Sequence, residues 1–178
     1  MTFRILRKLT NFRKRDDGVA AMEFALVLPV LLIILMGTIE FSNVLMVERK
    51  LLNAMQSVAD LIGKETDVSD ADLDEIFYAA QLVMYPYASS NMTIGVASVR
   101  YDDDTGTPTL DWSDSWNGGS VQNPTTLAAG RGSAGESIII VSGSYAYTPL
   151  STLVITSSFS LGETSYVRPR KVDYILKN

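Results

Sequence analysis

Carboxylates are the first side chains to consider for chemistry in this sequence, because its 178 residues include neither histidine nor cysteine. The lack of cysteine excludes disulfides, thiol catalysis and cysteine-ligated metals. The lack of histidine excludes Ser-His-Asp and Cys-His catalysis and the commonest zinc sites. The sequence also has no Gly-x-Ser-x-Gly motif and no glycine loop that would hold a phosphate. We therefore expect no catalytic residues, no cofactor and a protein that is not an enzyme.

Two clusters of acids could be taken for metal sites. The first lies around Ser69 and consists of Asp67, Asp70, Asp72, Asp74 and Glu75. Ser69 and Asp72 have the spacing of a helix N-cap, and acids at a helix start complement its dipole. In the second cluster, residues 102–106, glycine is fifth and Ser113 is twelfth, whereas an EF-hand needs glycine at the sixth position and glutamate at the twelfth. We predict a helix start and a hairpin turn, and no metal site.

Glu23 stands out because of its surroundings. It comes immediately before residues 24–39, which carry no charge and end at Glu40. An ionisable side chain in a membrane helix costs about 2.5–3.5 kcal/mol on insertion scales, so it calls for a partner.

The segment around Glu23 favours a membrane helix. Residues 1–15 carry basic side chains and no acid, whereas residues 51–178 are acidic on balance. Such a basic head could bind nucleic acid or flank a membrane. Residues 19–41, which are apolar except for Glu23 and Glu40, would form a helix of about 34 Å, which is long enough to cross a bilayer. We predict a membrane helix with an inward basic flank, no nucleic-acid partner, and residues 42–178 on the outer side.

Two other interpretations of this segment remain open, a cleaved secretory signal peptide and an ordinary signal anchor. Against the first, the apolar run is longer than the usual 7–15 residues, and no small-x-small cleavage site follows Phe41. In the second, Glu23 would be incidental.

The arrangement of Gly18, Glu23 and Phe24 before an apolar run resembles the leader junction of type IV prepilins and pseudopilins, particularly those of the Flp/Tad class. The resemblance implies that a prepilin peptidase removes the leader, residues 1–18, and leaves Val19 as the new N-terminus. Glu23 would then be the fifth mature residue. Its carboxylate, one helical turn along, could neutralise the new ammonium group of its own chain or of a neighbour.

The resemblance narrows to the TadE/TadG family of pilus-assembly proteins, and the length of the chain fits TadE best. Residues 18–30 resemble the opening signature of the family, and residues 37–41, which include Glu40, resemble its later Gly-x-x-Glu element. Residues 145–149 and 168–170 are similar to C-terminal motifs of its members. Pro29 would kink the helix and help it to leave the bilayer, or would be a membrane proline without a role.

Beyond the membrane, the periodicity predicts a pilin-like α+β fold. Apolar residues from Val44 to Ile62 recur on one helix face, so the helix should continue to Ile62 and pack that face on its own domain. A second helix should cover residues 71–85. Strands should cover residues 92–101, 137–141 and 156–167, with residues 145–150 extending or linking them. Residues 102–136 should be turns and a long loop, with a short strand at 109–112. The strands should form a small antiparallel sheet on the helices.

Two functions fit these observations. The first is a TadE-like minor pseudopilin with a structural role in a Flp/Tad-type pilus or a related secretion machine. It would lie in the bacterial inner membrane, and its partners would be the prepilin peptidase, other pilins and the Tad machinery, in an oligomer or filament. In that role we expect Gly18 and Val19 to form the processing site, and Glu23, Phe24, Pro29 and Glu40 to serve assembly. The second is a single-pass anchored periplasmic sensor or ligand-binding protein, which would keep its leader.

Overall fold

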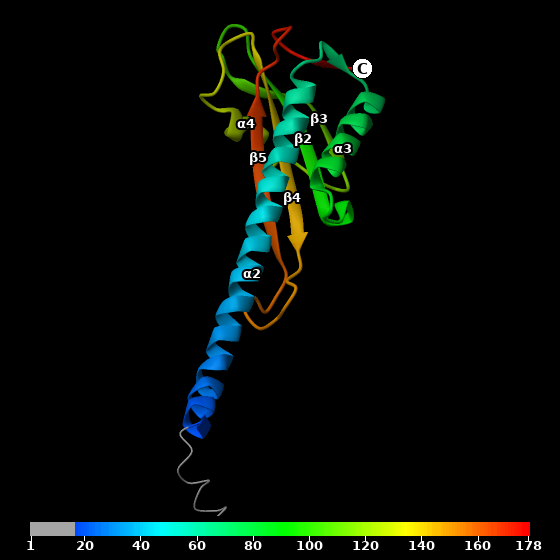
Figure 1. Ribbon diagram of the computed structural model, residues 1–178. Coiled ribbons are helices and arrows are strands. Elements are labelled where there is room, and N and C mark those ends of the chain that lie inside the picture. Colours follow the sequence, from blue (N-terminus) through cyan, green and yellow to red (C-terminus); the bar gives the residue numbers. More distant parts are fainter. Residues whose placement is uncertain (1–16) are drawn as a thin grey trace, which may run out of the picture.

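The computed structural model describes residues 17–178, so the basic part of the leader expected in residues 1–16 lies outside the described residues. One long helix, α2 (Asp17–Ile62), runs for 46 residues, or about 69 Å. Its C-terminal half packs on the domain, and its N-terminal half extends away from it (Figure 1). The prediction of a single rod from Val19 to Ile62 is confirmed.

The second helix is α3 (Asp70–Met84). Ser69 caps it: its Oγ accepts a hydrogen bond from the Asp72 amide, and the Asp72 carboxylate accepts one from the Ser69 amide in return, at 2.9 Å. This capping box satisfies two backbone donors. The helix predicted at residues 71–85 is confirmed, and it buries one apolar face: Leu73, Ile76, Phe77, Ala80 and Met84.

The main sheet is antiparallel and has four strands in the order β3-β2-β4-β5. Their bounds are β2 (Met92–Tyr101), β3 (Pro108–Trp116), β4 (Ser137–Tyr147) and β5 (Phe159–Val167). A short 3-10 helix, η1 (Ser89–Asn91), precedes β2. The α+β fold with helices on a small antiparallel sheet is confirmed.

The prediction for residues 102–136 contained too little regular secondary structure. The segment contains the full strand β3, where we expected only residues 109–112, and the short helix α4 (Pro124–Ala128). A two-stranded parallel pair, β1 (Asp67–Val68) with β6 (Leu176–Lys177), was also missed. The turn between β2 and β3 is the predicted hairpin: Asp102 Oδ1 accepts hydrogen bonds from the Asp104 and Thr105 amides. These bonds lower the pKa of Asp102.

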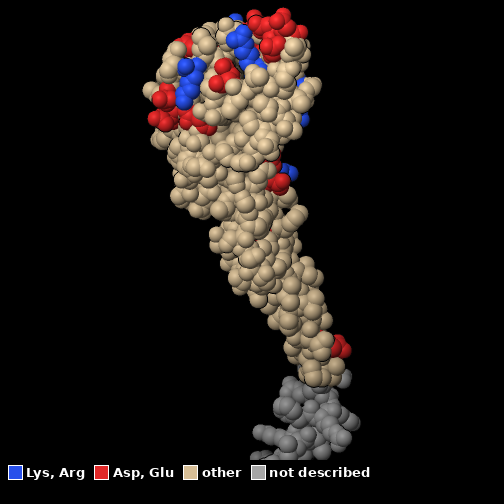
Figure 2. Space-filling view, turned by 180° about the vertical axis from the view of Figure 1, so that it is seen from behind, with Lys and Arg blue, Asp and Glu red and all other residues tan. Residues whose placement is uncertain are grey.

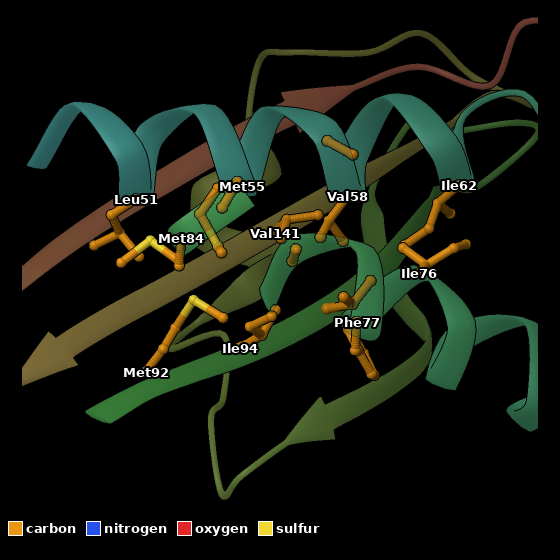
Figure 3. Packing of buried hydrophobic residues seen from close by; sticks show 14 of the residues in the cluster. Leu51, Met55, Val58, Ile62, Ile76, Phe77, Met84, Met92, Ile94 and Val141 are labelled. Atoms are coloured by element: carbon orange, nitrogen blue, oxygen red, sulfur yellow. The ribbon is translucent and has the colours of Figure 1, made fainter. Parts of the chain in front are cut away.

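The core lies between the sheet and the two helices (Figure 3). The predicted apolar face of α2, between Val44 and Ile62, lies against this core, since Leu51, Met55 and Val58 are fully buried there. Gly143 in β4 allows this close packing, because a Cβ at that position would overlap the Met55 side chain. The sheet and α3 thus hold the C-terminal half of α2 firmly and fix the direction in which the other half projects.

Candidate assembly site

The N-terminal half of α2 is an exposed apolar rod. Within the described residues, α2 is the one helix long and apolar enough to cross a membrane. Its large apolar side chains from Val19 to Ile39 are exposed to the surroundings of the molecule. In water, so large an apolar surface would be unfavourable, which fits a single-pass membrane anchor.

Five of the six predicted site residues lie on this rod: Gly18, Val19, Glu23, Phe24 and Pro29. All five are exposed, and nothing lies within 4 Å of a Cβ built on Gly18. The helix continues through Pro29 although proline cannot donate its backbone hydrogen bond. These side chains do not take part in the folding core, so their surfaces are available to lipid or to other subunits.

The sixth residue, Glu40, lies in a different environment. It is only 2 % exposed. Its Oε1 accepts a hydrogen bond of 2.7 Å from the Tyr147 hydroxyl at the end of β4 and one of 3.2 Å from the Leu150 amide. Burial, together with the bond to Glu40, raises the pKa of Tyr147, which stays protonated and donates. Glu40 therefore joins α2 to the loop that follows β4.

Sequence reasoning did not find this partner of Glu40. Both residues belong to motifs that the sequence analysis singled out, since Glu40 is part of the Gly-x-x-Glu element and Tyr147 is part of the motif at residues 145–149. Their pairing was not visible, because they are 107 positions apart. No local pattern in the sequence links these two residues, so the sequence holds no signal for the hydrogen bond between them.

The second C-terminal motif contacts α2 as well. Arg170 Nη2 lies 2.6 Å from Asp60 Oδ1, and the Arg170 amide donates to the Gly63 carbonyl just after the helix end. The last turn of α2 has no basic residue of its own, so Arg170 supplies the cation that stabilises a helix C-terminus. Residues 145–149 and 168–170 thus fix the two ends of the stretch from Glu40 to Gly63.

Two of the acids around Ser69, Asp72 and Asp70, make contacts that stabilise the fold. Asp72 takes part in the capping box, and the hydrogen bonds from Ser69 lower its pKa. Asp70 lies 3.0 Å from Lys177 Nζ, and Lys177 also pairs with Asp114 of β3. Across residues 17–178, no group of three or more acidic side chains converges as a metal ion would require.

Comparison with known proteins finds a family match on the long helix α2. Residues 18–60 match the model of the TadE-like protein family, so this stretch of α2 is a TadE-like segment, and the recognition made from residues 18–30 and 37–41 is confirmed. Neither the curated proteins nor the solved structures gave a match to the chain. A TadE-like segment associates the protein with Tad pili.

Proposed function

We propose that this protein is a minor pseudopilin that acts structurally in assembly of a Flp/Tad-type pilus or a related secretion machine, and that it is not an enzyme. The observation that supports this most is the division of the TadE-like segment into two halves. One half of α2 is a bare apolar rod, and the other is built into a folded domain. Such a subunit can sit in a bilayer and later exchange lipid for the apolar helices of its neighbours.

The topology follows from the charge distribution. The basic residues 1–15 stay in the cytoplasm, α2 crosses the inner membrane, and the domain lies in the periplasm. A prepilin peptidase then cuts between Gly18 and Val19 at the inner face of the membrane. The exposure of Gly18 and Val19 supports this assignment, because no described part of the chain outside α2 packs on Gly18.

In assembly, the two glutamates have different tasks. Glu23 lies exposed in the apolar rod and pairs with the ammonium group of Val19, its own or a neighbour's, where the low dielectric strengthens the attraction. Glu40 is already satisfied inside the subunit by Tyr147 and Leu150. Its role is to hold the domain in a fixed position on the helix, so that packing of one subunit's rod also places its domain.

The test is the intact mass of the protein purified from cells with the peptidase. We expect a chain that begins at Val19. Gly18→Val should block cleavage by crowding the scissile bond, and since open space surrounds a Cβ at Gly18, the fold should be unaffected. Ala20→Val places a valine two residues further along and is the matched control, which should still be processed. A wild-type chain that keeps residues 1–18 in such cells would contradict the proposal and favour an ordinary anchor.

A further inference from the structure

The loop between β4 and β5, residues 148–158, carries large apolar side chains on its outside. Leu150 is 76 % exposed and Leu153 is 71 % exposed, and Val154 is also exposed. The loop belongs to a stretch without any charged residue that runs from Ser137 to Gly162. An exposed apolar loop of this kind marks a surface that meets something other than water.

This loop lies beside α2, at the membrane-facing end of the domain. In Figure 1 it extends below the sheet along the helix, toward its N-terminal end. Val154 is 3.7 Å from where a Cβ on Gly37 would be, and the Leu150 amide bonds to Glu40. The loop is therefore level with residues 37–40 of α2.

By the length of helix that a bilayer needs, the outer boundary of the bilayer would lie close to residues 37–40. A hydrocarbon core of about 30 Å takes about 20 helical residues. If the core began at Val19 it would end near Thr38, and if it began at Phe24, after the first acid, it would end near Asn43. Both placements put the loop within about one helical turn of the boundary.

The distribution of charged side chains fits a position of the loop at the bilayer surface. On the face shown in Figure 2, charged side chains gather at the end of the domain far from the rod, and the surface between the domain and the rod is almost free of them. Near the hydrocarbon, the carboxylate of Glu40 receives its two hydrogen bonds from Tyr147 and from the loop itself. A carboxylate at low dielectric needs such donors.

We propose that residues 148–158 insert into the outer face of the bilayer, with Leu150 and Leu153 among the lipids, as a second membrane contact beside α2. We assign lipid as the partner of this surface. Insertion of α2 brings the loop to the outer boundary of the bilayer in every subunit, before that subunit contacts any other. The proposal rests on the proposed function only in that α2 spans the membrane. The contact would restrain the tilt of the domain until the subunit leaves the bilayer.

The experiment uses the full chain in vesicles of phosphatidylethanolamine and phosphatidylglycerol. Since the chain has no cysteine, a polarity-sensitive fluorophore can be attached to one introduced cysteine at a time. Leu153→Cys tests the loop. Ile33→Cys tests the span, and Asp104→Cys reports the far end of the sheet, because β2 runs from the loop side at Met92 to Tyr101. Lipids with a nitroxide at a shallow or a deep acyl position quench the fluorophore according to its depth.

We expect the probe at residue 153 to lose emission mainly to the shallow nitroxide, the probe at residue 33 mainly to the deep one, and the probe at residue 104 to neither. Quenching at residue 33 without quenching at residue 153 would overturn the loop proposal and leave the span intact. Absence of quenching at both would overturn both. A probe at residue 153 that is shielded from water but not quenched, and that becomes exposed when the protein is diluted in the vesicles, would show a second copy on the loop instead of lipid.

A charge variant gives an independent check. With the probe on Thr152→Cys, the double substitution Leu150→Asp and Leu153→Asp should abolish the shallow quenching, whereas Leu150→Ile and Leu153→Ile should keep it. Both leucines are exposed, so neither variant should unfold the domain. Unchanged quenching in the aspartate variant would show that these two side chains do not hold the loop in the bilayer.

Discussion

Tyr147 donates a hydrogen bond of 2.7 Å to Glu40, and this contact joins the middle of the long helix α2 to the end of strand β4. The tyrosine is almost completely buried, and its ring lies 5.5 Å from that of Phe159 at the start of β5. The junction between rod and domain is thus a packed and hydrogen-bonded contact.

The first prediction concerns this contact. Tyr147→Phe keeps the ring packing but leaves the buried Glu40 carboxylate with only the Leu150 amide as donor. We expect a loss of about 1.5–3 kcal/mol in the free energy of unfolding, as for other hydrogen bonds to charged groups. Chemical denaturation of the full chain in detergent measures it. Tyr78→Phe, on the exposed side of α3, is the control and should change the stability little. Equal stability of the two variants would show that the Glu40 contact contributes nothing.

The second prediction is a pH dependence at the other end of the domain. Lys177 of β6 pairs with Asp114 and Asp70, and these hydrogen bonds raise its pKa above the usual 10.5. Because the folded pKa is the higher one, the stabilisation is complete below pH 10.5 and is lost as the pH rises through the folded value.

Lys177→Met removes this stabilisation at every pH. We therefore expect the variant to be less stable than the wild type by about 1.5 kcal/mol near neutral pH, and the difference to shrink in alkaline solution. Denaturation curves at a series of pH values measure it. Lys64→Met, at an exposed position, should show no such trend. A difference that is constant up to strongly alkaline pH would mean that the ion pairs are not its source.

The sequence was sufficient for the elements whose side chains follow a regular period. The apolar face of α2 between Val44 and Ile62 and the helix α3 were predicted, because a helix that is buried on one side must repeat its apolar residues every three or four positions. The strand at residues 92–101 was predicted with its observed bounds, since its length and its β-branched residues are typical of a strand in the core.

Strand β3 was underestimated for a physical reason. It is an edge strand, none of its residues is fully buried, and Asp111 and Asp114 interrupt any apolar pattern. Such acids protect an edge from pairing with other chains. Its conformation is imposed by its partner β2 rather than by its own residues. The Glu40–Tyr147 contact was missed for a related reason, because a single hydrogen bond between distant segments leaves no local pattern.

The third prediction is the topology of the membrane helix. With the basic residues 1–15 in the cytoplasm, everything after the span lies outside, including the C-terminal residue Asn178 next to β6. Alkaline phosphatase fused after Asn178 should be active, because this reporter folds only outside the cytoplasm. A cytoplasmic reporter at the same position should be inactive. The opposite pair of results would reverse the orientation of α2.

The last prediction separates the two glutamates of α2. Glu23→Gln keeps the shape of the side chain but removes its attraction for an ammonium group at Val19. Insertion should persist, because neutralising an acid in a membrane segment lowers its transfer cost. The domain should remain folded, since Glu23 is exposed and its core begins at Val47, about 36 Å further along the helix. Piliation should nevertheless fall, because the ammonium group would remain unpaired in a low-dielectric contact between subunits.

Glu40→Gln provides the contrast. Its amide oxygen can still accept the Tyr147 hydrogen bond, but the charge-assisted part is lost, so the free energy of unfolding should fall. Counts of pili, protein in the membrane fraction and intact mass are measured in the same strains. In the Glu23→Gln strain we expect few pili with normal processing and membrane content, and in the Glu40→Gln strain any loss of pili should accompany a loss of protein. Normal piliation with Glu23→Gln would show that this carboxylate is not an assembly contact.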